Sequence, residues 1–319
     1  MADQSRIIIG VDIGGTKVAA GIVNTNGEIL ARNRTPMATT GAPSNGLSSV
    51  STAIRGLFPD DTSQRQISAI GICAPGPLNP KTGVIINPPN LAIWHNYPLA
   101  EEMRRVFNVP VKIDNDGNAA ALAEVKWGAA RGYTNVFYAT VGTGIGAGIV
   151  FDGHIYHGKT GAAAEGGHVG IDRAGPVCNC GKRGCIETLA AGPAIARRAR
   201  QKLARDSSSL LMEMAGGDIQ KVTGEMVGKA NALGDPVAKE VINETLDLLA
   251  YWLGNIVDLL EPDVIVMGGG VSSLLAPYLE EIRERWQGTI INPTPMDIPL
   301  VLAHYGEDAG IAGAAALCD

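Results

Sequence analysis

A short sequence pattern occurs twice in the chain, each time after an apolar, strand-like run and before a turn glycine. At a constant offset, the two copies are Gly15, Thr16, Ala20, Gly21, Ile22, Val23 and Gly142, Thr143, Ala147, Gly148, Ile149, Val150. The turn glycines are Gly27 and Gly153. Glycine and alanine are abundant in this chain, so the matching residue identities alone are weak evidence for a repeat. The matching strand, turn and hairpin context nevertheless favours duplication of one supersecondary unit.

Strand-like and helix-like segments alternate along the first half of the chain. Apolar runs predict strands at Arg6–Asp12, Val18–Val23, Glu28–Arg34, Ile67–Cys73, Val109–Ile113 and Asn135–Val141. Helical patterns cover Ser44–Phe58, Leu99–Phe107 and Asn118–Lys126, and a loop is expected at Pro77–Trp94. With 319 residues the chain has room for about two domains. The alternation is typical of the α/β class.

The second half is mainly helical before it returns to a strand. Asp235 as N-cap and Pro236 at the first helical position predict a long helix that stops at Glu261-Pro262. Asp263–Met267 is then a buried strand that ends in the glycine run Gly268–Gly270. The tail, Gly306–Leu317, is a helix of small residues suited to close packing against another element.

Composition and charge exclude several classes of partner. The net charge of -6 argues against a nucleic acid or an acidic membrane bound through a basic field. We expect no membrane span and no secretion signal, because long uninterrupted apolar runs are absent. Three of the five cysteines lie within eight residues of one another, unlike a disulfide framework. A reducing, cytoplasmic setting is therefore expected.

Three predicted strands end in glycine turns, at Asp12–Lys17, Gly142–Gly146 and Gly268–Gly270. Glycine lets successive backbone N–H groups approach an anion, although a single such turn is also explained as a hairpin. The first turn has neither P-loop nor dinucleotide-fold spacing. It resembles the phosphate loop of the actin-like ATPase superfamily, in which two duplicated ribonuclease-H-like domains clamp ATP in the cleft between them.

That resemblance implies a role for each turn. Gly14, Gly15, Thr16 and Lys17, with Gly142, Thr143 and Gly144, would cradle the ATP phosphates. Gly268, Gly269 and Gly270 would lie against the adenosine. Asp12 would hold Mg²⁺ directly or through water, since Mg²⁺ prefers oxygen ligands. The alternative for Asp12 is a strand-end or turn carboxylate.

One imidazole and three thiols lie close together in a glycine-punctuated segment: His168, Cys178, Cys180 and Cys185. This set suits tetrahedral zinc. Cysteines scattered through a core are the alternative, which the close spacing among turn glycines disfavours. Four protein ligands leave no open position for water, so we interpret the zinc as structural. It would fix the loop that carries Glu165 and Glu187.

The segment Asp114–Asn118 combines two carboxylates and two amides between a strand and a helix. Such residues can simply cap the helix. Phosphoryl transfer to an alcohol also needs a carboxylate beside the attacking hydroxyl, and Asp116 suits that role. Asn90, Asn115, Glu165 and Glu187 offer donors and acceptors for sugar hydroxyls. We assign no partner to His95, His154, His157 or His304 and expect each to be an ordinary surface or core residue.

Ordered motifs over nearly the whole chain resemble the ROK family of bacterial sugar kinases and repressors, and specifically its glucokinases. They are VDIGGTK from Val11, APGPLNPKTG from Ala74, PNL at Asn90, DNDGNAAALAE from Asp114, GTGIGAG from Gly142, EGGH from Glu165, CNCGKRGCIE from Cys178 and GGGV from Gly268. The resemblance implies ATP-dependent phosphorylation of a hexose at its 6-hydroxyl, with Asp116 as general base.

The resemblance also implies sugar contacts and a domain division. The matched sugar-contact positions are Gly76, Asn90, Asn115, Asp116, Glu165, His168 and Glu187, so His168 would both ligate zinc and touch the sugar. The smaller domain would be 1–115 plus 305–319, with the first phosphate loop. The larger would be 116–304, with the second phosphate loop, the zinc site and the adenosine loop. Family members form dimers, sometimes tetramers.

Departures from the family pattern bear on the alternatives. The N-acetylmannosamine kinases of the family carry a threonine near the position where this chain has Pro89. Because that threonine is absent here, an amino-sugar kinase is only the second interpretation. The repressor branch places a helix-turn-helix before the phosphate motif, but only eleven residues precede Asp12 here. A sugar-sensing regulator without catalysis is a distant alternative, because it would not need Asp12, Asp116 and both phosphate loops intact. A chaperone-like or cytoskeletal ATPase is another, because neither has use for a zinc-braced acidic sugar pocket. The preferred hexose and a phosphoryl donor other than ATP stay open.

Overall fold

The computed structural model describes residues 7–59, 67–205 and 208–318 of the chain. By their internal contacts the residues form two compact units. Unit 1 comprises Met1–Val136, Gly148–Ala164 and Ala303–Asp319, and unit 2 comprises Phe137–Ala147 and Glu165–Leu302. The predicted domain boundary after Asn115 marks the start of the second sequence block, whereas the two units are defined by contacts. The predicted boundary therefore stays a prediction. Arg6, at the start of the first predicted strand, lies outside the described residues.

Unit 1 is built on a mixed sheet with strand order β3-β2-β1-β4-β7 in the described part of the chain. Its strands are β1 (Ile7–Ile13), β2 (Lys17–Val23), β3 (Ile29–Pro36), β4 (Ile67–Ala74) and β7 (Val111–Asn115). Its helices are α1 (Pro43–Arg55), α3 (Leu99–Phe107), α4 (Asp116–Lys126) and α12 (Ala309–Ala316). β2 and β3 form the predicted antiparallel hairpin, β1 pairs antiparallel with β2, and β4 and β7 join in parallel.

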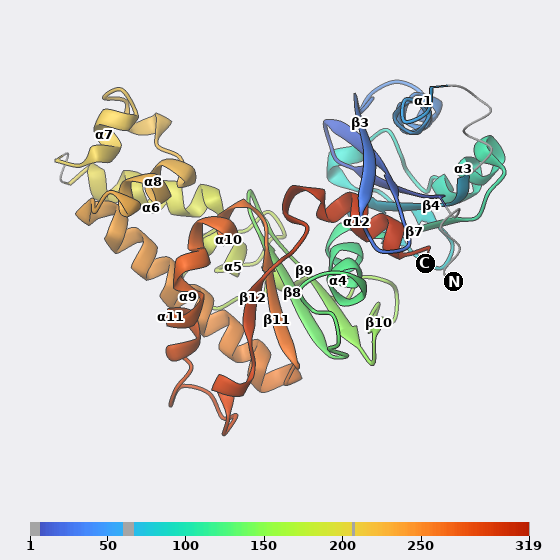
Figure 1. Ribbon diagram of the computed structural model, residues 1–319. Helices are drawn as coiled ribbons and strands as arrows, with labels where there is room; N and C mark the ends of the chain where they lie inside the picture. The colour runs from blue at the N-terminus through green and yellow to red at the C-terminus, as the bar shows by residue number, and fades with distance from the viewer. Residues whose placement is uncertain (1–6, 60–66, 206–207, 319) are drawn as a thin grey trace. The chain divides into compact units, whose positions relative to one another are not determined.

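The alternation of side chains along β1 sends apolar residues to both faces of this sheet. Ile9, Val11 and Ile13 pack with the helices α1 and α3 in one core. Ile8, on the opposite face, packs with Ile311 of α12. Figure 1 shows α12 on the side of the unit 1 sheet away from α1. The sheet is therefore a buried layer between helices, as expected for a strand that reads as a continuous apolar run.

Glycines allow α12 to lie directly on the sheet. A Cβ at Gly10 or Gly71 would overlap the carbonyl oxygens of Ile311 and Ala314, respectively. A Cβ at Gly313 would lie 2.5 Å from the backbone carbon of Ala119 in α4. The predicted small-residue helix is therefore confirmed, and its small side chains serve close packing on two neighbours.

A buried carboxylate forms hydrogen bonds with the backbone that leads into α12. Glu124 of α4 is 1% exposed. Its oxygens accept hydrogen bonds from the backbone N–H groups of Ala129 (2.7 Å), His304 (2.9 Å) and Tyr305 (3.2 Å). Three donors thus satisfy a charge that would otherwise be costly to bury.

The second sheet has the strand order β10-β9-β8-β11-β12 among the described residues. These strands are β8 (Val136–Val141), β9 (Ile145–Phe151), β10 (His154–Ile155), β11 (Val264–Gly268) and β12 (Leu300–Leu302). As in the first sheet, three consecutive strands lie beside two later ones, and the later pair is parallel. The common order supports duplication of one ancestral unit.

The helices of unit 2 include one of 25 residues, α9 (Pro236–Leu260). Both of its predicted ends are confirmed. The Asp235 carboxylate accepts from the Ala238 N–H at 2.8 Å, and Glu261 adopts a left-handed conformation with φ of 42°. Trp252 of α9 packs edge-on against Phe137 of β8, with 5.8 Å between ring centroids. The other helices are α5 (Ile186–Ala190), α6 (Gly192–Leu203), α7 (Leu210–Met214), α8 (Gly224–Ala232), α10 (Gly270–Leu275) and α11 (Leu279–Glu284).

Two differences from the sequence predictions are local. The expected loop Pro77–Trp94 contains the paired two-residue strands β5 (Leu78–Asn79) and β6 (Val84–Ile85) and a short 3₁₀ turn at Pro89–Leu91. Helix α4 begins at Asp116, two residues earlier than expected, because the Asn115 side chain caps it. In the portion of the chain that the structure describes, no helix combines the length and apolarity needed to cross a membrane.

Candidate nucleotide, sugar and metal sites

The first glycine turn connects β1 to β2. It is closed by a hydrogen bond from the Gly14 N–H to the Lys17 carbonyl at 2.9 Å, and Thr16 and Lys17 are exposed. A Cβ at Gly15 would lie 3.2 Å from both Cβ and the carbonyl oxygen of Asn90. The structure thus places Asn90, a predicted sugar contact, directly against the first predicted phosphate turn.

Three strands of unit 1 end side by side next to this turn, and each brings a polar residue. Asp12 of β1 is opposite Cys73 of β4, and Cys73 is opposite Asp114 of β7. Burial raises the pKa of the Cys73 thiol, and the charges of Asp12, Asp116 and Asp114 raise it further. Three carboxyl groups therefore gather around one buried thiol at the carboxyl ends of parallel strands, the usual place for ligands in such sheets.

Asp12 is the most constrained of these carboxyl groups. Its Oδ1 accepts a hydrogen bond from the Cys73 thiol at 3.5 Å. Burial raises the pKa of Asp12, an effect opposed by Cys73 and by the positive charges of Lys17 and Arg34. A carboxylate that is held in place at a strand end is the kind of oxygen ligand that Mg²⁺ requires.

The segment that follows β7 combines a helix cap with a candidate base. The Gly117 N–H is shared by Asn115 Oδ1 (2.9 Å) and Asp116 Oδ1 (2.8 Å). The capping function considered for this segment is therefore confirmed for Asn115. Asp116 lies in the first turn of α4, where the helix dipole stabilises negative charge. Gly76 is close by, since its Cβ would lie 3.8 Å from Asn115 Nδ2.

The expectation that His157 has no partner was wrong. Its Nε2 lies 2.6 Å from Oδ2 of Asp114, a residue that is only 3% exposed. The hydrogen bond to Asp114 raises the pKa of His157, although burial opposes it. Asp114 Oδ1 also accepts from the Asn115 N–H (2.7 Å) and from Asn118 Nδ2 (3.0 Å). Asp114 is therefore a structural anchor for the segment that carries Asp116.

The second glycine turn borders a cavity of about 480 Å³ within unit 2. Its lining includes Gly142 and Thr143 of the turn and the first residues of three helices, Gly192 of α6, Gly224 of α8 and Gly270 of α10. The Gly192 N–H also donates to the Gly142 carbonyl at 2.8 Å. Helix N-termini present unpaired N–H groups that suit phosphate. Gly192 and Gly224 were not predicted, and their only signal in the sequence is a glycine at the start of each helical segment.

Gly269 shapes the third glycine turn. Its φ of 86° lies in the left-handed region, and a Cβ there would lie 2.5 Å from the Val141 carbonyl oxygen. The backbone from Gly268 to Gly270 passes close to the end of β8, and at Gly269 only glycine meets both conditions. Gly270 then lines the same cavity as Gly142. The structure thus unites the second and third predicted turns.

Glu187 connects the cysteine segment to the second turn. It lies in the first turn of α5, two residues after Cys185. Its Oε2 accepts a hydrogen bond from the Ile145 N–H at 3.0 Å, and a Cβ at Gly144 would lie 2.6 Å from that oxygen. One carboxylate oxygen of a predicted sugar contact therefore holds the turn predicted to bind phosphate. Glu165, by contrast, is exposed.

The four predicted zinc ligands converge in unit 2. The ligand atoms of His168, Cys178, Cys180 and Cys185 all lie within 4.8 Å of one another. Cys178 Sγ is 3.5 Å from His168 Nδ1, and Cys180 Sγ is 3.6 Å from Cys185 Sγ. With Zn–S bonds of about 2.3 Å, sulfur atoms on a tetrahedral zinc are roughly 3.8 Å apart. The donor set and its dimensions therefore fit zinc.

The thiols of the cluster differ in pKa, and a hydrogen bond with the backbone lowers that of Cys180. Burial and the neighbouring thiols raise the pKa of Cys185 to about 12, so a metal charge would be needed to hold it as a thiolate. Gly181 and Gly184, with φ of 89° and 63°, provide the left-handed turns that fold the segment back on itself. Because the His168 Nδ1 faces the thiols, its Nε2 is the nitrogen left for another ligand.

The residues predicted for the site are divided between the two units. Unit 1 holds Asp12, Gly14, Gly15, Thr16, Lys17, Gly76, Asn90, Asn115 and Asp116. Unit 2 holds Gly142, Thr143, Gly144, Glu165, His168, Cys178, Cys180, Cys185, Glu187, Gly268, Gly269 and Gly270. Within each unit, contacts or a shared cavity link most of the predicted residues to one another.

Comparisons with known proteins identify the family of the chain. A glucokinase from Thermotoga maritima is 33% identical over 97% of this chain and 96% of its own. An N-acetylmannosamine kinase from Shigella boydii is 31% identical over 97% of both chains. A solved ROK family glucokinase from Streptomyces griseus, in complex with glucose and AMPPNP, matches with a TM-score of 0.82 at 32% identity over 98% of each chain. The family model described as "ROK family" matches residues 8–319. The chain therefore belongs to the ROK family.

Proposed function

We propose that the chain is a glucokinase, which transfers the γ-phosphoryl group of ATP to the 6-hydroxyl of glucose and of related hexoses. The observation that carries the proposal is the convergence of Asp12, Asp114 and Asp116 at the strand ends of unit 1, beside a glycine turn. The glucokinase relatives support it, and one of them was solved with glucose and AMPPNP.

In this proposal the phosphates of ATP bind to the backbone of two turns, Gly14–Lys17 and Gly142–Gly144, and the adenosine binds at Gly268–Gly270. The N-terminal ends of α6 and α8 border the unit 2 cavity, and the partial positive charge of their helix dipoles adds to the potential there. Asp12 would hold Mg²⁺, whose charge offsets that of the phosphate oxygens when it is bound. The protein thus contributes mainly positioning and electrostatic stabilisation.

Asp116 is the proposed general base. It accepts the proton of the 6-hydroxyl while the hydroxyl oxygen bonds to the γ-phosphorus and the bond to ADP breaks. Asp114, at the end of β7, accepts hydrogen bonds from the Asn115 N–H and from Asn118 of α4, and so holds the backbone on both sides of this base. The other sugar hydroxyls are assigned to Gly76, Asn90 and Asn115 in unit 1 and to Glu165, His168 and Glu187 in unit 2.

The zinc cluster has a supporting role in the proposal. Four protein ligands complete a tetrahedral site, so no position is left for a reacting water. His168 Nδ1 and the three thiols would hold the metal, while His168 Nε2 stays available for a sugar hydroxyl. The cluster then fixes α5 and, with it, Glu187.

An N-acetylmannosamine kinase is the second candidate, because a relative of that name is 31% identical over nearly the full chain. A coupled assay of the purified protein with ATP and glucose, mannose, N-acetylglucosamine or N-acetylmannosamine tests both. We expect the highest kcat/KM with glucose. A higher value with N-acetylmannosamine would favour the second candidate, and no turnover with any of the four would contradict both. Replacing ATP with ADP or polyphosphate in the same assay identifies the donor.

A further inference from the structure

His157 belongs to none of the motifs assigned to the proposed phosphoryl transfer, yet it contacts the segment that carries the proposed base. It follows β10 in the stretch Gly148–Ala164, which belongs to unit 1 although the stretches on either side of it in the sequence belong to unit 2. Its Nε2 donates a hydrogen bond to Oδ2 of Asp114 at 2.6 Å. The two residues are 43 positions apart, so this contact exists only in the folded chain.

The imidazole adds a hydrogen bond to a carboxylate that is almost completely buried. Asp114 is 3% exposed. Its Oδ1 accepts from the Asn115 N–H (2.7 Å) and from Asn118 Nδ2 (3.0 Å), while its Oδ2 accepts from His157. Loss of a donor to a buried carboxylate is costly. Without the imidazole, we therefore expect the Asp114 carboxylate to reorient towards other donors.

The hydrogen bonds of Asp114 Oδ1 lie on both sides of Asp116 in the chain. Asn115 precedes Asp116 and caps α4, and Asn118 follows it in the first turn of that helix. A reoriented Asp114 carboxylate would therefore shift the backbone that orients Asp116. A general base must be within hydrogen-bond reach of the proton that it accepts, and a displacement of about 1 Å can lower a rate by a factor of about 10².

The imidazole can hold Asp114 only if its own backbone is held in place. The His157 carbonyl accepts hydrogen bonds from the N–H groups of Gly161 (3.1 Å) and Ala163 (3.3 Å). Gly161 has a left-handed φ of 94°, and a Cβ there would lie 2.7 Å from Cδ of Pro80. The turn after His157 thus packs closely against the segment between β5 and β6, which gives the imidazole a fixed support within unit 1.

We propose that His157 is a positioning residue for phosphoryl transfer, which holds Asp116 in place through the buried carboxylate of Asp114. The inference rests on the proposed function, because it takes Asp116 as the general base. His157 itself contacts no reacting atom. It acts through one hydrogen bond, and Asp114 transmits its effect to the backbone on both sides of Asp116.

Two substitutions separate the hydrogen bond from the volume of the ring. His157→Ala removes the donor, whereas His157→Gln keeps an amide N–H₂ that can still donate to Asp114. With ATP and glucose saturating, we expect kcat to fall about 10- to 100-fold in His157→Ala and less than about threefold in His157→Gln. The KM for ATP should stay unchanged in both. The His157 side chain is 28% exposed, so both variants are expected to fold, which circular dichroism checks.

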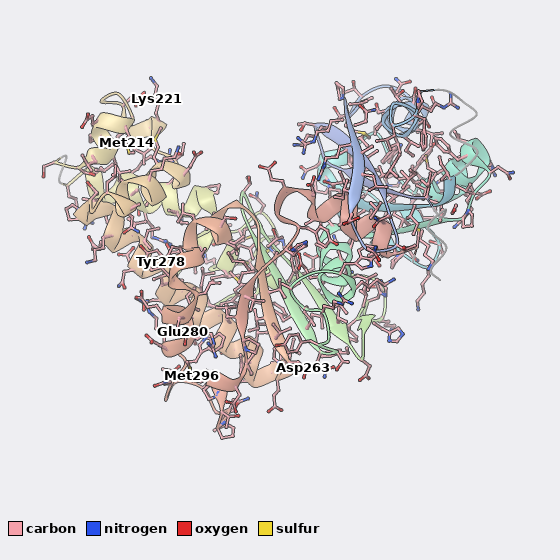
Figure 2. The ribbon with its side chains drawn as sticks, viewed as in Figure 1. Met214, Lys221, Asp263, Tyr278, Glu280 and Met296 are labelled. Carbon is pink, nitrogen blue, oxygen red and sulfur yellow. The ribbon has the colours of Figure 1, made fainter. Side chains whose placement is uncertain are left out.

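Two matched controls should keep the kcat of the parent. His154→Ala changes a nearby histidine whose Nδ1 lies 2.7 Å from the backbone carbonyl of Asp152. Glu280→Ala removes an ion pair with Arg283 that has the same length, 2.6 Å, and Figure 2 labels Glu280 in unit 2. An unchanged kcat in His157→Ala would overturn the proposal. A kcat of His157→Gln as low as that of His157→Ala would show that the hydrogen bond is not the cause.

Amide hydrogen exchange tests the structural step without turnover. With no substrate present, the peptide that contains Asp114–Asn118 should exchange at least about fivefold faster in His157→Ala than in the parent. His157→Gln and Glu280→Ala should exchange at the parent rate. Unchanged exchange of this peptide in His157→Ala would overturn the proposal whatever the kinetics show. A parent without turnover on any sugar would instead contradict the proposed function, and the exchange rates would still show whether His157 holds the segment.

Discussion

Glu187 provides a test of how the metal segment and the nucleotide turn are connected. Its Oε2 accepts the Ile145 N–H at 3.0 Å, next to Gly144. We expect Glu187→Ala and Glu187→Gln to weaken nucleotide binding even in the absence of sugar. The physical reason is that the turn would no longer be held in its binding conformation, and the nucleotide would have to order it on binding.

The magnitude follows from the single bond that is lost. A hydrogen bond to a charged group contributes about 1.5–3 kcal/mol net, against roughly 0.5–1.5 kcal/mol for a neutral pair. Since about 1.4 kcal/mol corresponds to a factor of ten, Glu187→Ala should raise the Kd for nucleotide by roughly 10- to 150-fold. Glu187→Gln keeps an acceptor, so an increase of about five- to tenfold is expected.

Calorimetry with AMPPNP and no sugar measures this Kd directly. Glu165→Gln is the matched control, because Glu165 is also a proposed sugar contact but is exposed and lies outside α5. It should raise the KM for sugar and leave the nucleotide Kd within about twofold of the parent value. If Glu187→Ala behaved like this control, the hydrogen bond to Ile145 would have no role in positioning the turn, and the reasoning would be refuted.

Four further changes test other parts of the structure. Asp116→Asn should lower kcat by about 10²–10⁴-fold with nucleotide Kd unchanged, and near-normal turnover would end its assignment as base. Metal analysis should find about one zinc per chain, lost in Cys178→Ser; fully active, metal-free protein would contradict the structural zinc. Glu124→Gln should lower the free energy of unfolding by about 2–4 kcal/mol in chemical denaturation, because an amide N–H₂ would face backbone donors. An unchanged denaturation midpoint would show that the Glu124 carboxylate does not stabilise the fold. The pKa of His157 should exceed its ordinary value of 6.5 in an NMR titration. Because the folded-state pKa is raised, the stability from the pair should be fully present below pH 6.5 and be lost as the pH rises through the folded-state pKa of His157. Asp114→Asn should abolish this dependence.

Local signals in the sequence were sufficient for much of the fold. The hairpin of β2 and β3, the Asp235 cap and the stop at Glu261 each depend on residues a few positions apart, and all three are confirmed. The α/β class and the family were likewise correct. The zinc ligands were recognisable because three of the four lie within eight residues, and the structure brings all four together.

The features that were missed depend on contacts between distant residues. His157 is 43 positions from Asp114, and no pattern on either segment indicates that they meet. Glu187 was predicted as a sugar contact on the loop fixed by zinc, but its hydrogen bond to Ile145 arises only after the second sheet forms.

The docking of α12 on the unit 1 sheet has a consequence for biosynthesis. The strand residues that it covers, among them Ile8 and Gly10, leave the ribosome first, whereas Ile311 and Ala315 leave it last. Unit 2 ends at Leu302, so its whole sequence has been translated before the covering helix emerges. The unit that begins translation is therefore the one completed last, and until then the part of its sheet that α12 covers, around Ile8 and Gly10, stays uncovered. Nascent chains of this architecture depend on termination, or on a chaperone, to protect that part of the sheet.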